Sequence, residues 1–145
     1  MSVTVEKALT ATPELLAGLN GLLPQLSSTA PPLTMNDVQR VVDSDTATLF
    51  VATDAGVAVG MLTLVVFSIP TGLRAWIEDV VVDEDARGLG VGEALTMAAI
   101  DEARGRGVRS INLTSRPSRG AANALYQKLG FERRDTNVYR FFLEN

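Results

Sequence analysis

Cysteine and histidine are both absent from the 145-residue sequence. Without cysteine the chain has no disulfide framework, no thiolate nucleophile and no cysteine-based zinc site, and without histidine it lacks the usual base near neutral pH. These absences disfavour serine–histidine and metal-assisted chemistry, so we predict no metal site. A strongly basic face is missing too, because the formal net charge is −4, and this argues against a nucleic-acid partner.

Long apolar runs are also lacking. The chain has no stretch of about 18 uncharged apolar residues, and its N-terminal residues lack the basic and apolar regions of a secretory signal. We therefore predict a cytoplasmic protein without a membrane partner. The sequence does contain 46% hydrophobic and 21% charged residues. This balance supports one continuous core, so we predict a single domain over residues 1–145.

The spacing of apolar residues predicts six strands and four helices. Strict alternation indicates strands, whereas apolar residues three and four apart indicate helices. Helix starts are marked by Thr12 before Pro13, by Thr34 with Asp37 three residues later, and by Ser118. The predicted strands are 3–8, 48–53, 57–67, 75–82, 110–114 and 137–143, and the predicted helices are 13–23, a segment after Thr34, 90–106 and 119–129.

The order of these elements predicts a mixed sheet. Strands 48–53, 57–67 and 75–82 are joined by short turns and should form an antiparallel meander. The strand–helix–strand passage that follows needs a crossover and therefore a parallel pair of strands. We predict an α/β (α+β mixed) fold in which four helices accompany a mostly antiparallel sheet of six to seven strands.

A glycine-rich turn lies between strand 75–82 and helix 90–106. Its sequence is Arg87-Gly88-Leu89-Gly90-Val91-Gly92, and it stands where unpaired backbone N–H groups and the helix dipole attract an anion. The three glycines keep side chains out of the approach path and permit positive φ, and Arg87 adds a cation. These residue types suit a diphosphate.

Two other phosphate-binding motifs do not fit this turn. The dinucleotide fingerprint needs a third glycine farther along, where Glu93 and Ala94 stand instead. A nucleotide-dependent oxidoreductase is therefore disfavoured. The P-loop needs Gly-Lys-Ser or Gly-Lys-Thr, and the sequence contains neither. A glycine turn without any ligand is the alternative interpretation.

Two blocks of sequence resemble the GNAT superfamily of N-acetyltransferases. The Arg-x-x-Gly-x-Gly pattern that begins at Arg87, after a strand ending in three valines, is similar to the family's acyl-CoA-binding motif. Residues 123–131 look like its Asn-x-x-Tyr helix and the Gly-Phe turn that follows. The chain departs from the family at Glu84, where proline is common, and this puts the local turn in doubt.

The resemblance implies the GNAT fold with acetyl-CoA as cosubstrate. In such a fold, strand 75–82 and the strand through Leu113 splay apart and open a slot for the pantetheine arm. Backbone groups of Val80 and Val82, with Val81 between them, would pair with the arm's amides as an added strand pairs with a sheet edge. Asn123 would hydrogen-bond the arm. A backbone N–H near Val80 would stabilise the developing oxyanion.

Glu78 is the candidate general base. Acyl transfer to an amine requires loss of the ammonium proton, and a carboxylate can accept it directly or through water. By the two-residue period of a strand, Glu78 should share a face with Val80 and Val82, while Asp79 should point to the opposite side. The stretch from Ile77 to Val80 also resembles the equivalent strand of glucosamine-6-phosphate N-acetyltransferases.

Two alternatives to this assignment stay open. Asp79, or a chain of water molecules, could act as the base instead of Glu78. Either acid could also be a charge at the strand end that pairs with Arg74 or Arg109.

Tyr126 is the candidate general acid. It follows Asn123 by three residues, so both side chains project from one face of a helix. A phenol with a pKa of about 10 can give a proton or a hydrogen bond to a thiolate whose conjugate acid has a pKa of about 8.5. The family resemblance gives Tyr126 this acid role. Packing against Leu125, Leu129 and Phe131 in a core is the alternative.

Four aromatic residues are candidate walls of an acceptor pocket, with the sheet core as the alternative location. They are Phe50, Phe67, Trp76 and Tyr139. Arg116 and Arg119 flank the start of helix 119–129. They could bind the phosphates of the nucleotide or an anionic part of the acceptor. The alternative is that both are solvated surface residues. The last strand carries Tyr139, Phe141 and Phe142, an apolar edge that predicts a homodimer.

The function that these residues predict is transfer of acetyl from acetyl-CoA to a primary amine on a small molecule, peptide or protein. A non-catalytic acyl-CoA-binding sensor or interaction module is the alternative, since the glycine turn alone explains binding. The presence of Glu78 and Tyr126 together favours an enzyme. The sequence does not identify the acceptor.

Overall fold

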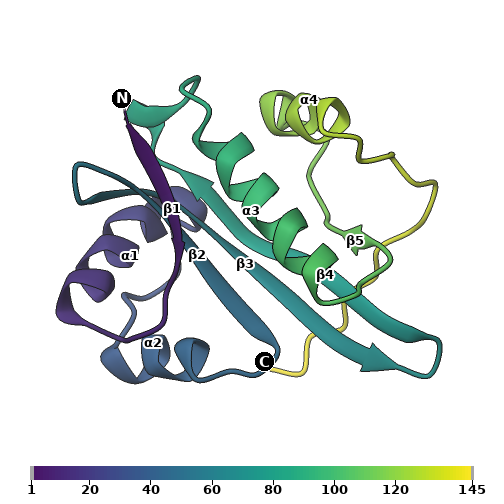
Figure 1. The fold of residues 1–145 in the computed structure, drawn as a ribbon, viewed down its shortest axis with the longest axis horizontal. Coiled ribbons are helices and arrows are strands. Elements are labelled where there is room, and N and C mark those ends of the chain that lie inside the picture. The colour runs from purple at the N-terminus through teal and green to yellow at the C-terminus, as the bar shows by residue number, and fades with distance from the viewer. Residues whose placement is uncertain (1, 145) are drawn as a thin grey trace. The chain divides into compact units, whose positions relative to one another are not determined.

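The computed structural model describes residues 2–144. The chain divides into two compact units, Met1–Thr114 and Ser115–Asn145, which we call the first and second unit. The first unit contains a sheet and three α-helices, and the second contains α4 (Gly120–Lys128), as the colours along the chain show in Figure 1. The elements follow the predicted order up to α4.

A mixed sheet forms the centre of the first unit, with the strand order β1-β2-β3-β4-β5. The first four strands pair antiparallel and β5 runs parallel to β4, which confirms the predicted mixed fold. The prediction of six to seven strands is wrong for the described residues, which contain five. The strands are β1 (Val3–Lys7), β2 (Ala47–Asp54), β3 (Val57–Ile69), β4 (Gly72–Val82) and β5 (Ile111–Asn112).

Two helices, α1 (Pro13–Leu26) and α2 (Met35–Val42), cover one face of this sheet, which we call the α1–α2 face. Each helix buries an apolar stripe against alternate residues of the central strands, as amphipathic helices do. The buried cluster consists of Leu19, Leu22, Val38, Leu49, Val51, Met61 and Val81.

The opposite face of the sheet is covered by α3 (Val91–Gly105) (Figure 1). The helix approaches β3 closely at Gly60, where a Cβ atom would lie 2.9 Å from Val91 Cγ1 and 3.0 Å from Leu95 Cδ1. A glycine at this point of the strand therefore permits the start of α3 to pack directly against the sheet.

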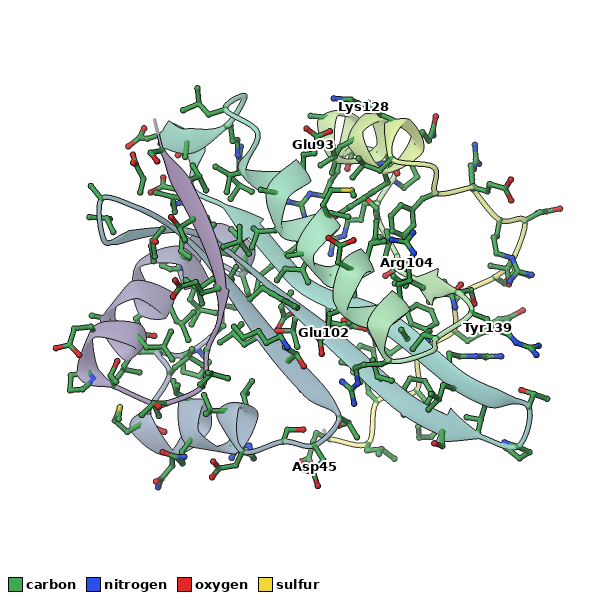
Figure 2. The ribbon with its side chains drawn as sticks, viewed as in Figure 1. Asp45, Glu93, Glu102, Arg104, Lys128 and Tyr139 are labelled. Carbon is green, nitrogen blue, oxygen red and sulfur yellow. The ribbon has the colours of Figure 1, made fainter. Side chains whose placement is uncertain are left out.

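Polar contacts also join the C-terminal half of α3 to the sheet. Glu102, labelled in Figure 2, forms an ion pair of 2.6 Å with Lys7 of β1. Arg106, just after α3, donates to the backbone oxygen of Asp45 at 3.5 Å. Both contacts are at least partly exposed, and such pairs contribute about 1 kcal/mol or less. The apolar packing of α3 therefore holds it in place.

The helix starts of α1 and α2 form as predicted. Thr12 Oγ1 accepts a hydrogen bond from the Leu15 N–H at 3.1 Å. Thr34 and Asp37 form a capping box, in which each side chain accepts from the other residue's backbone N–H, at 3.2 and 2.8 Å. These caps satisfy helix N–H groups that have no partner within the helix.

The end of α1 lies three residues beyond the predicted one, at Leu26. The predicted helix, 13–23, stops before Pro24, because proline lacks an N–H and crowds the preceding turn. The helix nevertheless continues through Pro24, and the Ser27 N–H closes its last turn on the Leu23 carbonyl at 2.9 Å. One lost hydrogen bond near a helix end is thus tolerated.

A β-bulge interrupts the alternation of β4. Thr63 pairs with Glu78 and Met61 pairs with Val81, so three steps along β4 face two steps along β3. Asp79 lies inside the bulge with a φ of 51°, an uncommon value for a residue other than glycine.

The bulge changes which side chains share a face of the sheet. Directly opposed residues of an antiparallel pair lie on the same face, so Glu78 lies on the α1–α2 face together with Val81. The prediction that Glu78 shares a face with Val80 and Val82 is wrong. The extra residue shifts the two-residue period by one position, as bulges do.

The second unit contains α4, whose predicted cap is wrong. Arg119 rather than Ser118 is the cap residue, and it makes no side-chain cap hydrogen bond. The Arg119 N–H donates to the Arg116 carbonyl at 3.0 Å. This tight turn places Ser118 one residue too early to act as a cap.

The predicted final strand, 137–143, is absent from the described residues. Its side chains alternate in the sequence, but Tyr139, Phe141 and Phe142 are 88%, 85% and 75% exposed. A strand requires a hydrogen-bonded neighbour, and no described segment pairs with this one. Alternation alone is therefore insufficient here.

None of the helices within residues 2–144 is long and apolar enough to cross a membrane. The same residues also contain no group of three or more acidic, histidine or cysteine side chains placed to hold a metal ion.

Candidate functional site

The glycine turn connects the short 3-10 helix η1 (Glu84–Ala86) to α3. Gly88 and Gly90 have φ values of 79° and 84°, which side chains with a Cβ rarely adopt. Open space lies beside both glycines among the described residues. Gly90 is the N-cap of α3 and provides no side-chain acceptor. The start of α3 therefore has no side-chain cap, and a phosphate is the kind of acceptor that can take the place of one.

The other residues of the turn separate into exposed and anchoring ones. Arg87 is exposed and Leu89 is 52% exposed, whereas Val91 is 1% exposed and packs in the core. The Gly92 carbonyl accepts a hydrogen bond of 2.7 Å from the buried Thr96 hydroxyl. The turn thus presents backbone and a cation outward, while Val91 fixes the helix start.

The turn that Glu84 put in doubt is well formed. Asp83 caps η1 by accepting from the Asp85 N–H at 3.1 Å, and the Ala86 N–H donates to the Asp83 carbonyl at 2.8 Å. The Glu84 N–H donates to Gln25 Oε1 of α1 at 2.9 Å. Sequence reasoning missed Gln25, because its partner lies 59 positions away and no local pattern marks the contact.

Strand pairing covers a short part of the β4 edge that faces β5. The two parallel strands pair at Ala75 with Ile111 and at Trp76 with Asn112. Residues 77–82 of β4 have no strand partner on this side in the part of the chain that the structure describes. Their N–H and C=O groups on this edge could pair with a ligand that adds as a strand. This geometry agrees with the splayed pair that the family resemblance implies.

Glu78 borders a hollow of about 310 Å³ on the α1–α2 face. Val65, Phe67 and Trp76 line the hollow together with Glu78. The Glu78 side chain is exposed and forms no ion pair with Arg74 or Arg109 in residues 2–144. The structure thus places this carboxylate beside aromatic and apolar surface, where it is accessible to water and to a ligand.

The four predicted aromatic walls have different locations. Phe67 and Trp76 line the hollow and are half-buried rather than part of the fully buried core. Phe50 is 4% exposed and pairs with Leu62, which is 0% exposed, so it belongs to the core. Tyr139 lies in the second unit. The hollow also contains Val65, which the sequence analysis did not select, although it lies opposite Trp76 in the β3–β4 hairpin and counting the register could have found it.

Asn123 lies on α4 and binds the turn that precedes this helix. Its Nδ2 donates to the Arg116 carbonyl at 2.9 Å and to the Arg119 carbonyl at 2.8 Å. Both amide hydrogens are therefore used within the second unit. The carbonyl oxygen Oδ1 is the group of Asn123 that is left for a ligand, as an acceptor.

Tyr126 lies one turn further along the same helix. Its ring meets Phe131 edge-on, with a centroid distance of 5.7 Å and an interplanar angle of 64°. Burial of the phenol raises the pKa of Tyr126 above its ordinary value, against a smaller opposite effect of the Arg119 charge. The hydroxyl is therefore protonated near neutral pH. A protonated phenol can donate a hydrogen bond or a proton to a ligand.

Comparison with known proteins identifies the relatives of this chain. Residues 19–131 match the model of the Acetyltransferase (GNAT) family. Glucosamine 6-phosphate N-acetyltransferase 1 of Oryza sativa subsp. japonica is 33% identical over 136 residues, which cover 86% of this chain and 79% of that protein. A mycothiol acetyltransferase of Paenarthrobacter aurescens (strain TC1) is 48% identical over 57 residues. That match covers 39% of this chain and 18% of the relative, so the chain spans less than a fifth of its length.

Solved structures agree with this relationship. A putative acetyltransferase from Agrobacterium tumefaciens str. C58 has a TM-score of 0.85 and 28% sequence identity, over 96% of this chain and 99% of that one. The family match includes β4, the glycine turn and α4. This chain therefore belongs to the Acetyltransferase (GNAT) family.

Proposed function

We propose that this chain transfers an acetyl group from acetyl-CoA to a primary amine by direct attack of the amine on the thioester. One observation carries the proposal: the start of α3, which has no side-chain cap and follows Gly88 and Gly90, comes after a strand whose edge beyond Trp76 has no strand partner in the described chain. An anion site and a free strand edge are what a diphosphate and an amide-containing arm require. Family membership supports the same coenzyme.

The first unit supplies most of the proposed coenzyme contacts. Arg87 and the main chain from Gly88 to Gly92 would bind the diphosphate, and the main chain of Val80, Val81 and Val82 would pair with the pantetheine amides. Asn123 of the second unit would accept a hydrogen bond from the arm through Oδ1, because both of its amide hydrogens are engaged. Acetyl-CoA, when bound, supplies the acetyl group as a reactive thioester.

Two side chains would move the protons of the reaction. The amine nitrogen forms a bond to the acetyl carbon and the carbon–sulfur bond breaks. Glu78 takes the proton that the amine loses, directly or through water, since its carboxylate is exposed. Tyr126 gives its proton to the departing sulfur, since its phenol is protonated at neutral pH. Asp79 lies in the bulge next to Glu78 and is the alternative base.

The proposed acceptor site is the hollow beside Glu78. A carboxylate at the rim attracts an ammonium group, and Trp76 and Phe67 offer a surface on which a sugar ring or another apolar body can pack. The rice relative carries glucosamine 6-phosphate in its name, so an amino sugar is the small-molecule acceptor to test first. A peptide amine is the second class.

The test follows thiol release from acetyl-CoA with a panel of amino sugars, aminoglycosides and peptides. We expect Glu78→Gln and Tyr126→Phe to lower kcat by about 100-fold or more, while the Kd for acetyl-CoA measured by calorimetry stays within about twofold. Glu6→Gln, an exposed acid on β1, is the matched control and should leave turnover unchanged.

Two results would contradict parts of the proposal. Unchanged turnover in both variants would remove Glu78 and Tyr126 from the chemistry. Acetyl-CoA binding without thiol release, with every amine, would favour the non-catalytic sensor or interaction module.

Four further proposals concern domain organisation, localisation, nucleic-acid binding and oligomeric state. We propose that residues 1–145 work as one domain in the cytoplasm, without a nucleic-acid partner. A homodimer is supported by the exposed aromatic side chains of Tyr139, Phe141 and Phe142. Light scattering on the wild type and on Phe141→Asp tests it, because a dimer that uses this segment should dissociate in the variant.

A further inference from the structure

A side chain of α1 holds the backbone from which the glycine turn starts. Gln25 Oε1 accepts from the Glu84 N–H at 2.9 Å, and Gln25 Nε2 donates to Asp83 Oδ1 at 3.4 Å. These bonds connect the last turn of α1 to the junction between β4 and η1. We call this pair of bonds the Gln25 clasp.

The clasp completes a network around Asp83. The Asp83 N–H donates to the Val59 carbonyl at 2.8 Å, and the Asp83 carbonyl accepts from the Ala86 N–H at 2.8 Å. The Arg87 N–H then donates to the Glu84 carbonyl at 3.4 Å. Backbone bonds therefore hold Asp83 from the sheet side, and the clasp holds Asp83 and Glu84 from the helix side.

Gly88 and Gly90 lie between this network and the buried Val91, which anchors the start of α3. Gly88 and Gly90 adopt positive φ in open space, and glycines lose more conformational freedom on ordering than other residues. A ligand that binds such a turn must offset this entropy. Fixing the residues just before the turn reduces the number of conformations that binding has to exclude.

The backbone at the clasp has a geometry that proline could also adopt. Asp83 has φ −52° and ψ 132°, in the extended region that the residue before a proline prefers. Glu84 is the first residue of η1, a position at which helices tolerate proline. Proline at position 84 would remove the Glu84 N–H and with it the hydrogen bond to Gln25 Oε1.

We infer that Gln25 is a positioning residue for the coenzyme turn. Its two hydrogen bonds restrict the backbone conformation at residues 83 and 84, as a proline ring at position 84 would do covalently. This inference rests on the proposed acetyl-CoA site. Gln25 touches neither the diphosphate nor the acceptor in this assignment. It acts through Asp83 and Glu84 on the residues from Arg87 to Gly92.

The test is a double-mutant cycle on Gln25 and Glu84, read by calorimetry with acetyl-CoA. Gln25→Ala should raise the Kd about three- to tenfold, the loss expected for hydrogen bonds of this kind. The KM for acetyl-CoA should rise by the same factor while kcat stays within about twofold. Glu84→Pro in the Gln25→Ala background should restore the Kd to within about twofold of the wild type, because the ring replaces the clasp.

Gln39→Ala is the matched control, because Gln39 also makes a side-chain hydrogen bond from a helix, to Asp43 at 2.8 Å, but lies in α2 away from the turn. It should bind acetyl-CoA as the wild type does. A wild-type Kd for Gln25→Ala would overturn the inference. Weakened binding that Glu84→Pro fails to restore would overturn it too, since the loss would then come from the packing of α1.

A second readout separates this inference from the proposed function. Without any ligand, hydrogen exchange of the amides from Arg87 to Gly92 should be faster in Gln25→Ala and return to the wild-type rate in the double variant. If the wild type fails to bind acetyl-CoA, the proposed function is wrong, and the exchange rates alone decide whether the clasp orders the turn.

Discussion

The two compact units of this chain differ in what holds their residues in place. All buried side chains of the described residues lie in the first unit, on the two faces of the sheet. The second unit contains no buried residue in the range 115–144. Its ring contacts include the edge-on pair of Tyr126 and Phe131 and the Arg140 guanidinium, which lies 5.8 Å from the centroid of the Phe142 ring. The buried core, which provides most of the stability, therefore lies in the first unit. The proposed general acid, Tyr126, lies in the second unit, where no described side chain is buried.

The largest expected effect tests this division directly. Leu62→Ala in β3, at a side chain that is 0% exposed, should lower the free energy of unfolding by about 2–5 kcal/mol because it creates a core cavity. Phe141→Ala removes a larger side chain that is 85% exposed, and should change the free energy by less than about 0.5 kcal/mol. Urea titrations measure both, and similar losses would show that the second unit buries Phe141.

The second largest expected change in stability comes from substituting one glycine in each unit, Gly60 and Gly120. Gly60→Ala should cost about 1–3 kcal/mol, because a Cβ would lie 2.9 Å from Val91 Cγ1 and 3.2 Å from the Val81 carbonyl. Gly120→Ala in α4 meets open space and should be neutral or slightly stabilising, since alanine favours a helix. Thermal unfolding distinguishes them. A Gly120 variant as unstable as the Gly60 variant would disprove the difference between the units.

The pH dependence of unfolding sharpens the comparison at alkaline pH. Burial raises the pKa of Tyr126 above 10.0, so the folded chain holds this proton more tightly than the unfolded chain does. The resulting stability is present below pH 10 and is lost as pH rises through the folded pKa. The difference in unfolding free energy between the wild type and Tyr126→Phe should therefore fall above pH 10. A difference that stays constant to pH 11 would mean that partial burial of the phenol does not raise its pKa.

The smallest expected change in stability comes from Asp37 of the first unit at acid pH. The Thr34 N–H, then the Thr34 hydroxyl and Arg40, lower the pKa of Asp37 below 3.8. The stability from this capping box is present above pH 3.8 and is lost as pH falls through the folded pKa. Compared with Asp37→Asn, the wild type should lose its advantage between pH 4 and pH 2. An advantage that persists at pH 2 would rule out this linkage.

Features that depend on neighbouring residues could be predicted from the sequence. Thr12, Thr34 and Asp37 cap their helices by contacts within three residues, and the glycine turn is defined by its own φ preferences. The parallel pair followed from the crossover that any strand–helix–strand passage needs. These signals were sufficient for the mixed fold and for the turn.

Features that depend on distant partners could not be predicted. The bulge at Asp79 is set by how β4 pairs with β3, so the face of Glu78 was predicted wrongly relative to Val80 and Val82. Gln25 meets Glu84 across 59 positions. Apolar and polar residues do alternate over 137–143, but no described strand pairs with this segment. Each of these three features depends on a contact with a residue far along the chain. The cap of α4 and the end of α1 were also predicted wrongly, although both are local features.

The bulge at Asp79 also determines where β4 can lose a residue. Deleting Asp79 would leave two steps along β4 opposite two steps along β3, so Val81 would keep its pairing with Met61 and its place in the buried cluster. A deletion outside the bulge would instead turn the side chains on one side of the deletion to the other face of the sheet. Deletion of Asp79, which is exposed, should therefore be tolerated better than a single-residue deletion elsewhere in this strand.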